Sequence, residues 1–173
     1  MKREVVRAVG EILRQLNRLE KLGINQNRLT KLRRETIFFL YEGGGDAKWA
    51  VDRPHSAKAR AVRRQMDNKT ISRANGLKQF TYEHAVPLKT LAVALRAASE
   101  SDEELEHFLD QHILGVVILR EEDERLVKKG LRQSMPLDAM PHDRLARYRE
   151  AGIEFEPEDL VKLRDGWSIH RVS

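Results

Sequence analysis

The sequence predicts a predominantly helical α+β protein whose helices surround a small two-stranded sheet. Apolar residues recur at helical spacing along most of the 173 residues, which is typical of amphipathic helices that pack on a core. The run Ile113–Leu119 is instead short, continuous and rich in β-branched residues, which is typical of a buried strand. Serine, glycine and proline separate these segments where helices are expected to begin and end.

The first segment, residues 1–45, is expected to form a helical hairpin. Apolar residues from Val5 to Leu19 share one face of a helix, and Gly23 is placed to end it. A second helix is expected over Gln26–Tyr41, and the glycines 43–45 end it because they lose too much backbone entropy in a helix. We interpret this hairpin as a scaffold, with a homodimer interface through the same helices as the alternative.

The second segment, residues 46–136, contains the expected strands. Ser56 is placed to cap a helix over Ala57–Met66, and a strand is expected over Leu77–Tyr82. Pro87 suits the first turn of the next helix, and the sequence 101–104, Ser-Asp-Glu-Glu, is a capping-box pattern for another.

After the strand Ile113–Leu119, a helix is expected from Arg120 to Lys129. Its acidic start and basic end match the helix dipole. The third segment, residues 137–173, is expected to hold two short helices, over Asp143–Glu150 and Glu158–Arg164. We expect the three segments to fold as one compact domain.

Positive charge is concentrated in the first half of the chain. Residues 1–80 hold 19 Lys and Arg against 8 Asp and Glu, whereas residues 81–173 hold 13 against 19, and the whole chain has a net charge of +5. Such segregation favours nucleic acid as the partner, and a merely solvated basic surface is the alternative.

The residue inventory excludes several classes of protein. The absence of cysteine excludes a disulfide framework and thiolate-bound zinc, so any metal must be held by His, Asp, Glu or Asn. The charged start is unlike a secretory leader, and no apolar stretch has the length of a membrane span. We therefore expect a cytoplasmic protein without membrane contact.

Two motifs occur where the expected strands end. The first is Glu83-His84-Ala85-Val86-Pro87, and the second runs from Val116 to Asp123, where a strand leads into an acidic helix start. Together they resemble the HNH, or ββα-metal, nuclease family. In that family an acid–histidine pair ends one strand, and a second strand leads to a helix whose first turn supplies a metal ligand.

The resemblance implies a ββα-metal-like core that hydrolyses phosphodiester bonds in DNA with a divalent ion, Mg²⁺ or Mn²⁺. It implies that Glu83 binds the metal, that His84 is the general base, and that Asp123 is the second ligand, with Glu122 as the fallback. The chemistry is consistent, because histidine titrates near neutral pH and two carboxylates suit a hard cation.

The sequence departs from the family pattern in identifiable places. Leu114 stands where the family has the asparagine that orients the histidine, and His112 is the nearest polar substitute. Asp123 stands where the family often has histidine, and two expected helices separate the motif halves.

Six basic residues are expected to contact phosphates: Arg60, Arg63, Arg64, Lys128, Lys129 and Arg132. A non-catalytic nucleic-acid-binding or regulatory protein, or a helical protein-interaction module, is the alternative to a nuclease. DNA is the expected partner, although the residues do not distinguish it from RNA.

Overall fold

The computed structural model describes residues 2–140 and 143–165 of the chain. The described elements are, in order, α1 (Lys2–Lys21), α2 (Gln26–Thr36), the π-helix η1 (Ile37–Tyr41), the 3₁₀-helix η2 (Gly45–Trp49), α3 (Ala57–Asp67), α4 (Arg73–Leu77), β1 (Phe80–His84), α5 (Leu88–Ala98), α6 (Asp102–His112), β2 (Gly115–Leu119), α7 (Arg120–Lys128), α8 (Ala146–Glu150) and α9 (Pro157–Asp165). The prediction of a predominantly helical α+β protein with a small two-stranded sheet is confirmed.

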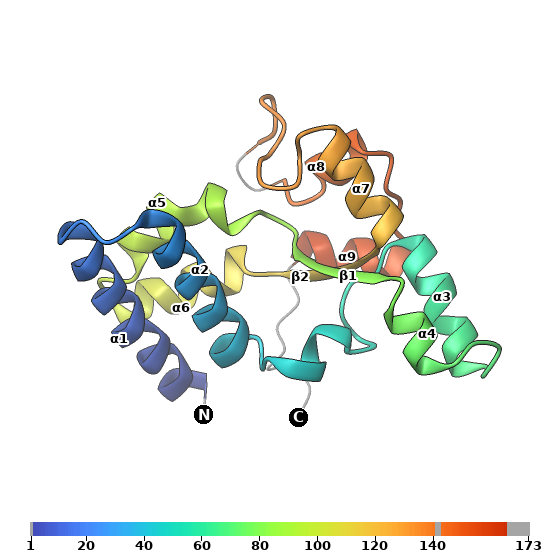
Figure 1. Cartoon of the computed structure of the whole chain (residues 1–173), viewed down its shortest axis with the longest axis horizontal. Coiled ribbons are helices and arrows are strands. Elements are labelled where there is room, and N and C mark those ends of the chain that lie inside the picture. The colour runs from blue at the N-terminus through green and yellow to red at the C-terminus, as the bar shows by residue number, and fades with distance from the viewer. Residues whose placement is uncertain (1, 141–142, 166–173) are drawn as a thin grey trace.

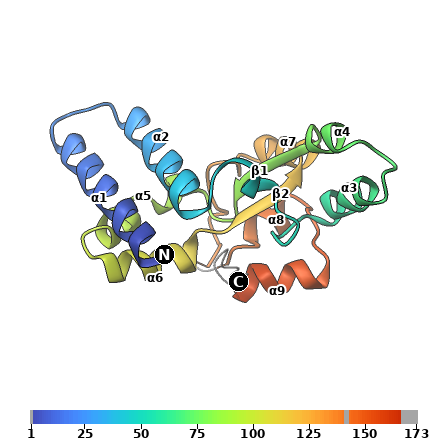
Figure 2. The same ribbon diagram turned by 90° about the horizontal axis from the view of Figure 1, so that it is seen from below.

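Helices α1, α2, α5 and α6 form a bundle at one end of the molecule, the sheet lies in the middle, and α3 and α4 lie at the other end (Figures 1 and 2). The bundle has its own apolar core, to which α1 contributes Val6, Val9 and Leu13. Ile12 and Leu19, which the sequence pattern places on the same helix face, remain partly exposed. The bundle therefore buries a narrower stripe of α1 than the sequence predicts.

Strands β1 and β2 pair in antiparallel fashion, so that Phe80 lies opposite Leu119 and His84 lies opposite Gly115. All five residues of β2 are buried, because both of its faces are covered. Val116 and Ile118 pack in a cluster that includes residues of α7, α8 and α9, whereas Val117 and Leu119 pack against residues of α3. This two-sided cover explains why β2 is continuously apolar rather than alternating.

Strand β2 passes directly into α7, whose first residue, Arg120, follows Leu119. Helix α7 contacts both strands, so β1, β2 and α7 form a strand–strand–helix unit. A side chain at position 115 would obstruct this unit, because a Cβ on Gly115 would lie 2.1 Å from the Tyr82 hydroxyl and 2.5 Å from Nη1 of Arg53. Glycine therefore allows β2 to approach the polar end of β1.

The helix caps follow the sequence closely. The Ser56 side chain accepts a hydrogen bond from Ala59 N at 3.1 Å, and the Ser101 side chain accepts one from Glu104 N at 3.4 Å, as the patterns predict. Several expected elements differ in their bounds. The helix expected over Gln26–Tyr41 ends at Thr36 and continues as the π-helix η1, and the strand expected over Ile113–Leu119 begins at Gly115. The first expected strand also differs. The strand begins at Phe80 rather than Leu77, because Ser72 caps the short helix α4 through a hydrogen bond from Asn75 N.

Helices α8 and α9 are slightly displaced from their expected bounds, and both contribute to the core that covers Val116 and Ile118. The end of the third expected segment, residues 166–173, lies outside the described residues. Across residues 2–140 and 143–165, no helix has the length and apolar character needed to cross a bilayer.

Candidate active site in a basic groove

A groove of about 1130 Å³ lies beside β1, and α2, the start of α5 and α7 contribute to its walls. Glu83, His84 and Asp123, which the sequence singles out, all line this groove. Of the described lining residues, four are acidic (Glu35, Glu83, Asp123 and Glu124) and seven are basic: Lys31, Arg34, Lys48, Lys89, Arg120, Arg132 and Arg147. The excess of positive charge suits an anionic ligand.

The imidazole of His84 is held by a carboxylate that the sequence did not reveal. Nε2 of His84 lies 2.8 Å from Oε2 of Glu42, and both side chains are almost fully buried. Because a carboxylate only accepts, this contact fixes Nε2 as the protonated nitrogen and leaves Nδ1 as the acceptor.

Glu42 is itself enclosed by polar partners. The Tyr82 hydroxyl donates to Oε1 of Glu42, and Nη1 of Arg53 donates to the same oxygen at 3.4 Å. Burial alone raises the pKa of Glu42, but His84, Tyr82 and Arg53 outweigh burial and lower that pKa below its ordinary value. Glu42 is therefore a buried anion beside the candidate base.

A run of glycines after Glu42 sets the path of the chain at this point. Gly43, Gly44 and Gly45 all have positive φ, at 85°, 57° and 47°, which other residues rarely adopt. In the sequence these glycines predict only the end of a helix. No sequence signal links Glu42 to His84, since 42 positions separate them.

Glu83 lies next to His84 on β1 but forms an ion pair with Arg147. Oε2 of Glu83 is 2.5 Å from Nη2 of Arg147. Oε1 of Glu83 is buried and has no hydrogen-bond partner among residues 2–140 and 143–165. Burial raises the pKa of Glu83 above its ordinary value, Arg147 and Tyr148 oppose this rise, and the charge of Asp123 adds to it.

Asp123, on α7, forms an ion pair with Arg132 in which Oδ2 lies 3.1 Å from Nη2. Both Asp123 and Glu83 line the groove, and the charge of Asp123 contributes to the raised pKa of Glu83. This donor set fits a magnesium-like ion, because Mg²⁺ uses one or two carboxylates and fills its other positions with water and substrate phosphates. Within the described residues, no group of three or more acidic or histidine side chains is arranged to hold a metal.

Glu122, the expected fallback ligand, has a structural role instead. Its Oε2 accepts hydrogen bonds from the Ser56 hydroxyl at 2.5 Å and from Leu119 N at 2.8 Å. Glu122 is buried and lies outside the groove. The expectation for Glu122 is corrected, because this carboxylate caps the start of α7 and ties it to the start of α3.

Leu114 and His112 do not act on His84. Leu114 is buried in the core that covers Val116 and Ile118, and its carbonyl accepts a hydrogen bond from Ala85 N at 2.8 Å. The ring of His112 packs against Phe108 on α6, with the ring centroids 4.7 Å apart. Among the described residues, the polar group that contacts the His84 ring is the Glu42 carboxylate rather than a residue near β2.

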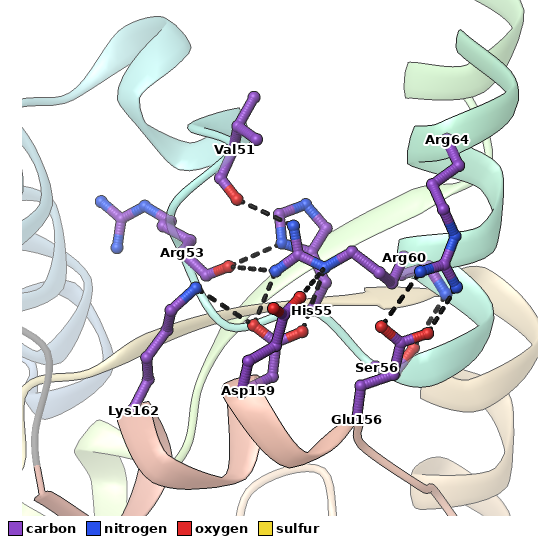
Figure 3. Close-up of polar contacts among 11 residues, drawn as sticks. Val51, Arg53, His55, Ser56, Arg60, Arg64, Glu156, Asp159 and Lys162 are labelled. Carbon is purple, nitrogen blue, oxygen red and sulfur yellow. Dashed lines mark hydrogen bonds and ion pairs between the residues drawn. The ribbon is translucent and has the colours of Figure 1, made fainter. Parts of the chain in front are cut away.

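The three arginines of α3 do not form the exposed phosphate-binding patch that the sequence predicts. Arg60 is buried and donates to Asp159 through Nε at 3.0 Å and Nη2 at 2.6 Å (Figure 3). Arg63 is buried and donates to the carbonyl of Trp49. Arg64 is exposed but is paired with Glu156 (Figure 3). The expectation is corrected, because Asp159 and Glu156 pair with Arg60 and Arg64, and Arg63 is buried against the segment before α3.

His55 lies in the same network, and we expect it to make stability sensitive to acid. Its Nδ1 is 2.7 Å from the carbonyl oxygen of Arg53, and its Nε2 has no partner in the described part of the chain. Burial, together with the charges of Arg60 and Arg63, lowers the pKa of His55 from 6.5 to about 4. Since the unfolded chain takes up the proton first, stability should fall as the pH drops from about 6.5 to about 4, by roughly 3 kcal/mol.

Chemical denaturation at a series of pH values checks this expectation. His55→Gln keeps a polar side chain that does not titrate. The variant should therefore lose less stability than the wild type as the pH drops across this window. An identical acid-induced loss in both proteins would show that other groups cause it.

The other basic residues expected to contact phosphates are spread over the surface. Lys128 and Lys129 are exposed and lie outside the groove, and Nζ of Lys129 is 3.2 Å from Oε1 of Glu150. Arg132 lines the groove. Arg132 is therefore the one residue of the expected six that the described groove includes.

No protein-family model, curated protein or solved structure matches this chain.

Proposed function

We propose that this protein hydrolyses phosphodiester bonds in nucleic acid, with DNA as the expected substrate. The observation that carries the proposal is the contact of 2.8 Å between His84, which lines a groove rich in basic residues, and the buried carboxylate of Glu42. A histidine oriented by a carboxylate is a recurrent general base, because its tautomer is fixed and its protonated form is stabilised.

The roles of the groove residues follow from their chemistry. Nδ1 of His84 takes the proton from the attacking water, and Glu42 stabilises the imidazolium that results. Glu83 and Asp123 would hold a divalent ion, Mg²⁺ or Mn²⁺, which when bound supplies charge stabilisation at the phosphate oxygens. Arg120, Lys31 and Lys89 contact the backbone phosphates of the substrate.

Cleavage of plasmid and oligonucleotide substrates in Mg²⁺ or Mn²⁺ tests the proposal. His84→Ala should lower the cleavage rate by at least about 100-fold, which is the lower end for loss of a general base. His107→Ala is the matched control, since His107 is exposed on α6 and lies outside the groove. EDTA should abolish cleavage by the wild type. Equal rates for wild type and His84→Ala would rule out the assignment.

One observation favours a second candidate, a nucleic-acid-binding protein without catalysis. Both proposed metal ligands are paired with arginines, Glu83 with Arg147 and Asp123 with Arg132. Such a protein would bind nucleic acid with a steep salt dependence, and Mg²⁺ or Mn²⁺ would leave its melting temperature unchanged.

A further inference from the structure

Aromatic side chains accompany the basic residues along the groove. The ring of Phe38 lies 5.6 Å from that of Tyr82, measured between centroids, and Tyr82 lies 5.7 Å from His84. Trp49 and Phe80 form a neighbouring pair with centroids 6.0 Å apart. All five residues line the groove, and Phe38 and Trp49 are only partly buried. A row of rings thus leads to the candidate base.

Cations that are available to a ligand lie around this row. In the described part of the chain, Lys31, Lys89 and Arg120 line the groove without an ion pair. Lys48 lies with its Nζ 4.9 Å from the centre of the Trp49 ring. Rings interleaved with unpaired cations match the chemistry of a nucleic acid whose bases and phosphates are both accessible.

The reactive groups are recessed in the groove. The side chains of His84, Glu83 and Asp123 are 10%, 11% and 14% exposed. A duplex keeps its bases stacked inside the helix, so Phe38 and Trp49 cannot stack on them unless the duplex opens. A single strand can bend into the groove and turn its bases onto the rings.

We propose that the groove binds single-stranded nucleic acid, with a base stacked on Phe38 and the adjoining phosphate directed to His84. This inference rests on the proposed function, since it names the substrate class of the same site. The proposal predicts that a single strand binds more tightly than a duplex, which is the opposite of what charge alone favours. Simple attraction to basic residues favours the duplex, which has the higher charge density, so a preference for single strands reports contacts with bases.

Fluorescence anisotropy with labelled oligonucleotides measures this preference. A single-stranded DNA, the RNA of the same sequence and the corresponding DNA duplex are titrated with full-length protein in EDTA, so that nothing is cleaved. The wild type should bind at least one of the single strands about tenfold more tightly than the duplex, since stacking of one base contributes about that much. The DNA and RNA arms show which sugar is accepted.

Two matched pairs of variants identify the surface that binds. Phe38→Leu should weaken single-strand binding about tenfold and leave duplex binding within about twofold. Phe39→Leu should have a much smaller effect, because Phe39 is 58% exposed and lies outside the groove. Its ring packs edge-on against that of Phe38, with the centroids 5.0 Å apart, and leucine keeps an apolar side chain at this contact. Arg120→Gln should weaken single-strand binding and reduce its salt dependence, whereas Lys128→Gln, on the same helix but outside the groove, should not.

The outcomes separate this inference from the proposed function. Duplex binding that equals or exceeds single-strand binding by the wild type overturns the inference, even if the protein cleaves DNA in metal. Equal effects of Phe38→Leu and Phe39→Leu also overturn it. Single-strand preference without cleavage supports the inference and contradicts the nuclease. If Phe38→Leu does not fold, two measurements still test the inference. They are the preference of the wild type for single strands and the comparison of Arg120→Gln with Lys128→Gln.

Discussion

Asp159→Asn is expected to destabilise the protein by about 3–5 kcal/mol, the usual cost of removing one partner from a buried ion pair. The carboxylate of Asp159 is fully buried and accepts two hydrogen bonds from the guanidinium of Arg60. Arg60 also donates to the carbonyls of Val51 at 2.9 Å and Arg53 at 3.1 Å. Asparagine has the same shape as aspartate but leaves the positive charge of Arg60 without a buried counterion.

Chemical denaturation measures the loss, and the structure provides an internal control. Arg64 and Glu156 join the same two regions but are far more exposed than Arg60 and Asp159, so Glu156→Gln should cost much less stability than Asp159→Asn. The double variant Arg60→Met, Asp159→Asn should recover part of the loss, because the guanidinium that lost its counterion is also removed. A loss in Asp159→Asn no larger than in Glu156→Gln would mean that water relieves the buried charge.

The ion pairs of α3 with Asp159 and Glu156 explain why the phosphate contacts predicted from the sequence differ from the structure. Arg60, Arg63 and Arg64 are close together on a helix, and a basic cluster of this kind predicts an exposed patch. The carboxylates that pair with Arg60 and Arg64 are distant in sequence, since Asp159 lies 99 positions after Arg60 and Glu156 lies 92 positions after Arg64. Local spacing defines the face of a helix, but the packing of α9 decides whether that face reaches water.

Elements that depend on local chemistry were predictable. Ser56 and Ser101 cap their helices through their own side chains, and the β-branched run Ile113–Leu119 contains the strand Gly115–Leu119. The predicted start of β1 was less accurate, because the strand can begin only after the short helix α4, which Ser72 caps.

The candidate site was only partly predictable for the same reason. Glu83, His84 and Asp123 could be proposed from their places at the ends of strands, and all three line one groove. The partners that decide their chemistry, Glu42 and Arg147, come from regions whose local sequence suggests only a helix end and a short helix. Such partners follow from tertiary packing, which periodicity does not encode.

Arg147→Met is the second variant for which we expect a large effect, about 3–5 kcal/mol of lost stability. The guanidinium of Arg147 is buried and donates to the carbonyls of Ala85 at 3.0 Å, Leu131 at 3.0 Å and His84 at 2.6 Å. It is also the counterion of Glu83. Methionine fills much of the volume but removes the charge and all of these donors, so one carboxylate and several carbonyls lose their partner.

Denaturation of three further variants separates the charge from the hydrogen bonds. Glu83→Gln with Arg147→Met should be more stable than Arg147→Met alone, because the unpaired carboxylate is gone. Arg147→Lys should remain destabilised although it keeps the charge, because an ammonium cannot reproduce the fixed geometry of five donors. Glu83→Gln alone should lose stability, since it leaves Arg147 buried without its counterion. If Arg147→Met were as stable as the wild type, the ion pair would not hold β1 to α8, and Glu83 would be free to serve another partner.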